Sequence, residues 1–161
     1  MLTDLQELNG QARVWIYPSD SVFSEQNKDE INIHLNRFIT SWTAHNQALK
    51  SYGNVFHNQF VTLFVDETMT SASGCSIDSS VRFVQELGKH YQVDFFNRML
   101  FSYIDADSKV ISLKAPAFKQ AFADGKITED TMVFDHLVKT KEDFEKSWMK
   151  PLKDSWHKRF V

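Results

Sequence analysis

The sequence lacks the features that mark a secreted or membrane-bound protein. It has one cysteine among 161 residues, and one cysteine cannot form an internal disulfide. No apolar run approaches the length of about 18 residues that a membrane-spanning helix needs. The N-terminal stretch MLTDLQELNG has neither the basic region nor the apolar region of a signal peptide. We therefore expect a soluble protein of the reducing cytoplasm, with no membrane span.

Glycine, proline and clustered positive charge are also scarce. The chain has 5 Gly and 3 Pro, which excludes a fibrous or linker-rich protein. Its net charge is −3, with both signs mixed along the chain, so no basic cluster would attract nucleic acid. The six histidines show no metal-ligand spacing, and a lone cysteine provides no zinc cluster. We expect no nucleic acid, metal or cofactor.

Apolar side chains, in contrast, are plentiful. They make up 42% of the residues, and 14 of them are Phe. A chain of about 150 residues buries about 70% of its unfolded surface, which is enough for a substantial core. Because no repeat or long linker divides the chain, we expect residues 1–161 to form a single α+β domain.

The spacing of the apolar residues predicts the fold. β-Branched and aromatic runs predict strands, and apolar residues at helical spacing predict helices. The expected strands are 13–19, 52–56, 60–66 and a pair within 98–114, and the expected helices are 25–50, 78–89, one that starts near Pro116, and 141–149. The order βαββαβ predicts a ferredoxin-like antiparallel sheet with an added hairpin strand and C-terminal helices.

The only cysteine, Cys75, lies in the stretch TSASGCSIDSSVRF at the expected start of the second long helix. If Asp78 caps that helix, the thiol lies just before a helix N-terminus, whose partial positive charge favours the thiolate. The alternative is a buried cysteine that packs as a small apolar side chain.

The expected topology gives Cys75 two partners. In a βαββαβ fold the end of the first helix and the exit of the third strand lie at the same end of the sheet, which would bring His45 and Asp66 towards the thiol. Such a group supports nucleophilic catalysis, with Cys75 as nucleophile, His45 as base and Asp66 as the residue that orients the base. The alternative is that His45 is a boundary histidine hydrogen-bonded to the backbone.

The loop 71–79 also suits a second kind of site. Ser73, Gly74 and Ser76, together with the backbone amides of a helix N-terminus, are groups that bind phosphate or carboxylate. Asp78 belongs to the same loop, and its carboxylate would compete with the anion for those amides. The alternative is a loop that is rich in serine because serine suits turns and helix caps.

Several strings of residues carry a family resemblance: RVWIYPSD, SWTAH, VDE, ASGCSIDSSVRF and DSWHKRF. With these strings the chain resembles a small bacterial family of uncharacterised proteins of about this length, whose members are often labelled ABC transporter ATPases. An ATPase of that class needs the motif G-x-x-x-x-G-K-[ST]. Gly88-Lys89 is followed by His90 and Gly125-Lys126 by Ile127, so the residues do not support that label.

The sequence leaves three functions open. The first is a non-catalytic binding or interaction protein, with a small molecule, another protein or a second copy of the chain as its partner. The second is a thiol-dependent enzyme that uses Cys75. The third is a module that binds a small anion or a nucleotide. In each case the loop 71–79 is the expected site.

Overall fold

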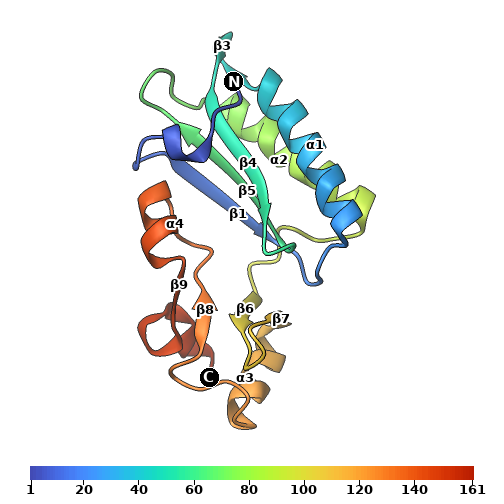
Figure 1. The fold of residues 1–161 in the computed structure, drawn as a ribbon, viewed down its shortest axis with the longest axis vertical. Helices are drawn as coiled ribbons and strands as arrows, with labels where there is room; N and C mark the ends of the chain where they lie inside the picture. The colour runs from blue at the N-terminus through green and yellow to red at the C-terminus, as the bar shows by residue number, and fades with distance from the viewer.

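The computed structural model describes residues 1–161 and shows a mixed α+β protein with four α-helices and antiparallel sheets (Figure 1). The strands are β1 (Arg13–Pro18), β2 (Thr43–Ala44), β3 (Gln47–Ala48), β4 (Lys50–Phe56), β5 (Phe60–Asp66), β6 (Leu100–Ile104), β7 (Val110–Lys114), β8 (Met132–Phe134) and β9 (Met149–Pro151). The helices are α1 (Glu25–Ser41), α2 (Gly74–Tyr91), α3 (Ala115–Ala123) and α4 (Lys141–Ser147). None of these helices is both long and apolar enough to cross a membrane.

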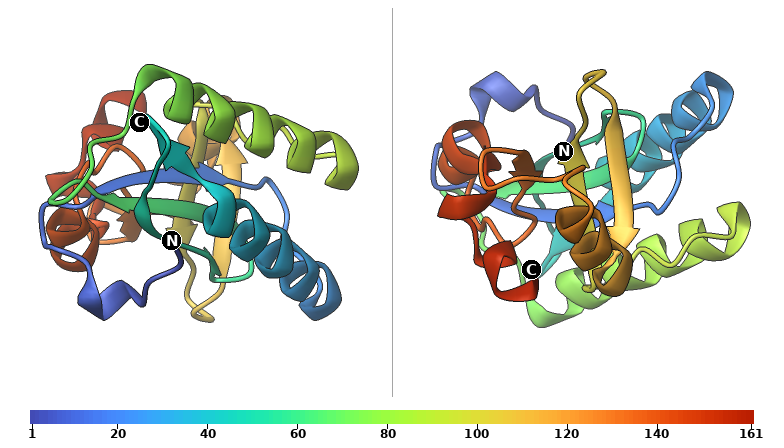
Figure 2. Two further views of the ribbon diagram at one scale, coloured as in Figure 1. Left: turned by 90° about the horizontal axis from the view of Figure 1, so that it is seen from above. Right: turned by 90° about the horizontal axis from the view of Figure 1, so that it is seen from below.

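The first half of the chain forms a three-stranded sheet of order β1-β5-β4, in which all seven residues of the central strand are buried. Helices α1 and α2 cover one face of this sheet, and Figure 2 shows α4 on its opposite side. Ile31, Leu35 and Ile39 repeat at helical spacing along α1 and pack with Val61 and Leu63 of β5. Alternate residues of β5 thus face the two helices.

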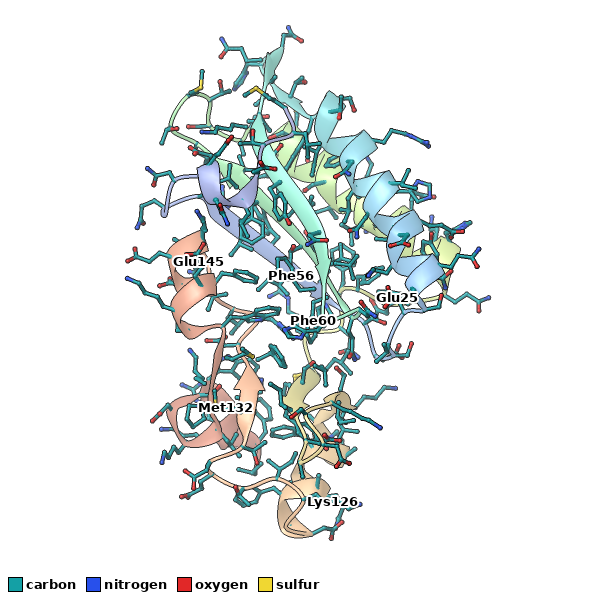
Figure 3. All side chains as sticks on the ribbon, viewed as in Figure 1. Glu25, Phe56, Phe60, Lys126, Met132 and Glu145 are labelled. Atoms are coloured by element: carbon teal, nitrogen blue, oxygen red, sulfur yellow. The ribbon has the colours of Figure 1, made fainter.

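The other face of β5 contacts the C-terminal part of the chain. Phe60 and Phe64 are fully buried there, and they pack with Phe134, Phe144 and Trp148. Figure 3 shows that Phe56 and Phe60 lie at the level where the two halves of the molecule meet. This aromatic cluster joins the halves through apolar contact.

The second half forms a four-stranded sheet of order β7-β6-β8-β9. Its own core gathers around Phe101 and Phe118, with α3 and the short 3-10 turns near the C-terminus packed against it. A polar contact also crosses between the halves, because Gln59 Nε2 donates to the Ser112 hydroxyl at 2.8 Å and to the Ser19 carbonyl at 3.1 Å.

The α+β class and the antiparallel pairing were predicted, whereas a ferredoxin-like arrangement is not confirmed. The order β1-β5-β4 agrees with that arrangement, but β6 pairs with β7 and β8 in the second sheet instead of with β1. The outer edge of β1 is paired in part by a later segment, since Val14 N donates to Lys139 O at 3.1 Å. Apolar alternation identifies a strand, but it does not identify the strand's partner.

The first helix is shorter than expected, and this moves His45 off the helix. Helix α1 ends at Ser41, and the next residues form the hairpin β2–β3. His45 and Asn46 make its turn with φ values of 51° and 63°, the left-handed conformation that two-residue hairpin turns require. Leu49 is buried as expected, but it belongs to the segment after the hairpin and not to the helix. Its helical spacing from Trp42 was therefore misleading.

The burial of β5 on both faces makes a stability prediction. Phe64→Ala should lower the free energy of unfolding by about 3–5 kcal/mol, because it removes a fully buried ring and leaves a cavity. The matched control is Phe96→Ala, since this ring is 40% exposed and its edge-to-face contact with Tyr17 accounts for about 1 kcal/mol. Urea unfolding of both variants checks the prediction, and equal losses would contradict it.

Candidate functional site

The loop 71–79 is organised by a helix cap. Ser73, not Asp78, is the N-cap of α2, and its hydroxyl accepts a hydrogen bond from Ser76 N at 3.1 Å. In return the Ser76 hydroxyl accepts from Ser73 N at 2.7 Å and donates to Ser73 O at 2.8 Å. This reciprocal arrangement is a capping box. The two serines that were expected to hold an anion therefore use their hydroxyls on each other's backbone.

Negative charge also lies close to this loop. Glu67 accepts a hydrogen bond from Ala72 N at 2.9 Å, and Asp78 is exposed on the first turns of α2. Both carboxylates repel an anion that approaches the remaining free amides of the helix start, at Gly74 and Cys75. The hydrogen bonds of the loop therefore cap the helix, and the nearby carboxylates disfavour a bound anion.

The three residues proposed for thiol chemistry have different environments. Cys75 is exposed, so it is not a buried apolar residue. His45 is exposed in the hairpin turn. Asp66 is buried at 2% exposure. No hydrogen bond joins any two of these three residues, so the structure shows neither a base in contact with the thiol nor a carboxylate in contact with the base.

Asp66 is instead committed to the backbone around it. Its carboxylate accepts hydrogen bonds from Asn9 N at 2.8 Å and from Thr68 N and Oγ1 at 2.9 and 2.6 Å, and Lys50 Nζ lies 3.7 Å away. Burial alone would raise the pKa of Asp66, but these hydrogen bonds and the Lys50 charge outweigh it, so the pKa is lowered. Asp66 thus stays ionised to hold two loops together.

The expected neighbourhood is nevertheless correct at the level of segments. Trp42, at the end of α1, donates its indole N–H to Ser76 O at 2.9 Å. Thr70 donates to the Gln47 side chain of the hairpin at 2.9 Å. The end of the first helix and the exit of β5 therefore do meet at one end of the sheet, as the strand order predicted.

A cleft of about 850 Å³ between the two halves is a stronger candidate site. We call it the interlayer cleft. It is lined by all of β1, by the linker residues 95–98, by residues 136–140, and by Val81, Leu100, Trp156 and His157. It opens where two paired segments separate: Lys141 N donates to Ala12 O and Val14 N to Lys139 O, and beyond Val14 the pairing stops.

The charges that line the interlayer cleft all have one sign. Arg13, Arg98 and Lys139 line it, and no aspartate or glutamate does. Arg13 lies 4.7 Å from the centre of the Trp15 ring and 3.7 Å from the Glu67 carboxylate. Arg98 and Lys139 are exposed and take part in no ion pair. Two cations are thus available to a ligand in the cleft.

Two histidines of this cleft are held in fixed environments. Trp148 donates its indole N–H to His136 Nδ1 at 3.2 Å, so the proton of the neutral ring is on Nε2, which is buried without a partner. His157 Nδ1 lies 2.6 Å from the Ser155 hydroxyl. Burial lowers the pKa of His136 to about 3 and that of His157 to about 4, so both rings are neutral at pH 7.

The indole of Trp156, beside these histidines, is fixed by a buried carboxylate. Asp135 accepts hydrogen bonds from Trp156 Nε1 at 2.9 Å and from Lys150 Nζ at 2.8 Å. Burial opposes ionisation, but these two contacts and a backbone hydrogen bond from Leu137 lower the pKa of Asp135. The ion pair of Asp135 and Lys150 therefore fixes the orientation of Trp156, although neither residue lines the cleft.

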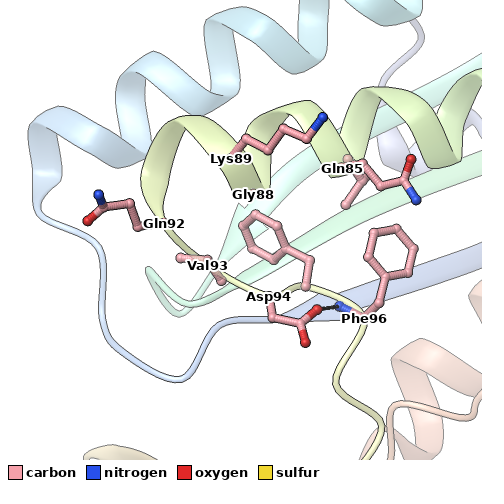
Figure 4. A pocket seen from close by; sticks show the side chains of 9 residues that line it. Gln85, Gly88, Lys89, Gln92, Val93, Asp94 and Phe96 are labelled. Atoms are coloured by element: carbon pink, nitrogen blue, oxygen red, sulfur yellow. Dashed lines mark hydrogen bonds between the residues drawn. The ribbon is translucent and has the colours of Figure 1, made fainter.

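A second hollow, of about 640 Å³, lies at the C-terminal end of α2 (Figure 4). Gly88 is required there, because a Cβ at this position would lie 2.5 Å from Val93 O. Asp94 accepts from Phe96 N at 3.0 Å, and Lys89 is the only cation of the lining. Because one positive and one negative side chain line it, this hollow has no charge preference comparable to that of the interlayer cleft.

No protein-family model, curated protein or solved structure matches this chain. What the interlayer cleft binds is therefore inferred from its own residues. Sequence reasoning missed the cleft because its lining comes from segments far apart in the chain. The signals in the sequence were Arg13, Trp15 and Tyr17 of RVWIYPSD and Trp156 and His157 of DSWHKRF. Each string taken alone looks like an ordinary strand or an ordinary C-terminal segment.

The neutral histidines predict a loss of stability in acid. Because the folded-state pKa values of His136 and His157 lie below the ordinary 6.5, the unfolded chain binds more protons as the pH falls. The stability that these rings contribute is fully present above about pH 6.5 and is lost progressively from there towards pH 4. Urea midpoints measured between pH 7 and pH 5 should fall. His136→Asn, which keeps an acceptor for Trp148, should reduce this fall, whereas His45→Asn should not.

The exposure of Cys75 makes a second prediction. Iodoacetamide should alkylate Cys75 in the folded protein at a rate close to that in urea, because this residue is exposed. His45→Ala should leave this rate unchanged, because no hydrogen bond connects the two residues. Mass spectrometry of the time course measures both rates, and at least a several-fold slower reaction in the variant would show that His45 does activate the thiol.

Proposed function

We propose that this protein is a non-catalytic binding protein that holds an anion with an apolar body in the interlayer cleft. The observation that carries the proposal is the charge of the lining: Arg98 and Lys139 take part in no ion pair, and no carboxylate lines the cleft, in a chain whose net charge is −3. A one-sign lining favours ligands of the opposite sign.

The shape and the apolar lining support the same ligand class. A volume of about 850 Å³ is within the range of about 300–1,000 Å³ that small-molecule sites occupy. Trp15, Phe96 and Trp156 contribute aromatic surface, and Arg98 and Lys139 contribute charge. A lining of 19 residues of which 11 are hydrophobic combines apolar surface with charged groups, as in sites that orient an amphipathic ligand.

The same lining argues against catalysis. It contains no cysteine, serine or carboxylate. The Thr140 hydroxyl accepts the capping hydrogen bond of Asp143 N, and burial raises the pKa of Tyr17 to about 12. Its two histidines have pKa values of about 3 and 4, and a general base works best when its pKa lies near the working pH. Neutral rings with such low pKa values are poorly suited to take protons from a ligand at pH 7.

The test uses 1-anilinonaphthalene-8-sulfonate, which combines a flat apolar body with one negative charge. We expect it to bind the folded protein at one site and to quench the fluorescence of Trp15 and Trp156. The double variant Arg98→Ala/Lys139→Ala should weaken this binding about tenfold or more, because a charged hydrogen bond contributes about 1.5–3 kcal/mol.

Two controls make this result specific. N-phenyl-1-naphthylamine has the same rings without the sulfonate, so the double variant should bind it as well as the unchanged protein does. Lys119→Ala removes an exposed cation of α3 outside the cleft and should leave sulfonate binding unchanged. If the double variant binds the sulfonate as tightly as the unchanged protein, the proposal is wrong.

Thiol chemistry at Cys75 is a second candidate function, favoured by the exposure of this thiol on the first turn of α2. The thiol does not line the interlayer cleft, so the two candidates can be separated. Alkylated protein should bind the sulfonate with unchanged affinity if the cleft is the site.

A further inference from the structure

One edge of β1 carries unpaired backbone groups inside the interlayer cleft. The register runs without a bulge from Arg13↔Val65 to Pro18↔Phe60, so alternate residues of β1 direct their N–H and C=O towards β5. Val14 is not one of these, because its N–H donates to Lys139 O on the other side. Ile16, two residues further, therefore also directs its N–H and C=O away from β5.

Ile16 lies beyond the point where the neighbouring segment leaves β1. That segment pairs with β1 through Lys141 N to Ala12 O and Val14 N to Lys139 O and then diverges, and residues 136–138 line the far side of the cleft. No residue of the chain bonds to the outward N–H or C=O of Ile16. An unpaired strand edge of this kind is a template for another strand.

We propose that the anion bound here is an extended acidic peptide, which adds beside β1 as a strand. Its backbone pairs with the N–H and C=O of Ile16, and its carboxylates contact Arg98 and Lys139. The inference rests on the proposed function, because it assigns the occupant of the same cleft. Main-chain pairing at a sheet edge provides affinity, and the side chains that flank the strand provide specificity.

The features of the cleft favour a peptide over a compact anion. A compact anion would use the cations alone, whereas a peptide also uses the donor and the acceptor that Ile16 presents side by side. Because alternate residues of a strand point to opposite faces, a peptide that alternates acidic and apolar residues would place its carboxylates on one face and its apolar side chains on the other. The lining contains partners for both kinds of side chain: Arg98 and Lys139 for the carboxylates, and Trp15, Phe96 and Trp156 for the apolar side chains.

The probe is the peptide acetyl-Val-Asp-Val-Asp-Val-amide, measured by isothermal titration and by displacement of the naphthalene sulfonate. Two further versions carry N-methyl groups on the three valines or on the two aspartates, which block opposite edges of the peptide strand. We expect one of these versions to bind about tenfold more weakly than the parent peptide and the other to bind nearly as well. Binding of both versions as tightly as the parent would overturn the inference.

A change in the protein gives an independent readout. Ile16→Pro removes the outward N–H without removing a hydrogen bond to β5, which edge strands tolerate, and it should weaken the parent peptide about tenfold. Ile16→Val, which keeps the N–H, should not. Circular dichroism verifies the fold of both variants, and if the proline variant does not fold, the N-methylated peptides on the unchanged protein decide.

The outcomes also separate this inference from the function on which it rests. If the sulfonate binds and depends on Arg98 and Lys139 but the peptide does not bind, the peptide inference is wrong and the anion cleft stands. If neither binds, the proposed function itself is wrong. The lysine peptide acetyl-Val-Lys-Val-Lys-Val-amide is the charge control, and binding of this peptide as tight as that of the aspartate peptide would also contradict the inference.

Discussion

Strand β5 is apolar on both faces, and the rest of the molecule is arranged to cover both. One face of β5 carries Val61, Leu63 and Val65, and the other carries Phe60 and Phe64. Each face must be shielded from water by other parts of the chain. Helices α1 and α2 provide the first cover, and α4 with the aromatic residues near it provides the second. Because a single layer of helices cannot cover both faces of a sheet, the C-terminal half must return to the first sheet.

This return creates the interlayer cleft. The chain leaves the four-stranded sheet after β8, lines the cleft with residues 136–138, and pairs with β1 over a short stretch just before α4. The linker of residues 95–98 bounds the other side of the same space. A cleft with a strand edge in its wall is therefore a consequence of how the two sheets are connected, and Arg13, Arg98 and Lys139 belong to its lining.

Local structure was predictable from the sequence to the extent that it depends on neighbouring residues. Ser24 and Thr140 directly precede the expected helices and cap them. The expected strand pair within residues 98–114 is also present, as β6 and β7. The hairpin after Trp42 was missed because the spacing of Trp42 and Leu49 also fits a helix. The hairpin differs from a helix only in the left-handed turn at His45 and Asn46, and the residue types alone do not predict that turn.

The site was less predictable than the fold, because it depends on contacts between distant segments. The loop 71–79 stands out in the sequence since serine, glycine and cysteine are chemically distinctive, yet the hydroxyls of Ser73 and Ser76 serve the helix cap. Arg98 and Lys139 are unremarkable in the sequence. Their shared positive charge can be related to a site only in the folded protein, where both line the interlayer cleft and no acidic residue does.

The side chain of Gln59 has a mechanical consequence for that space. Its amide group spans from the Ser19 carbonyl to the Ser112 hydroxyl, and Ser112 in turn lies 2.7 Å from the hydroxyl of Ser102 on β6. This short chain of hydrogen bonds ties the end of the first sheet to the second and so acts as a spacer. Gln59 does not line the cleft, so a residue outside the lining contributes to holding the two sheets that bound the cleft in their relative positions.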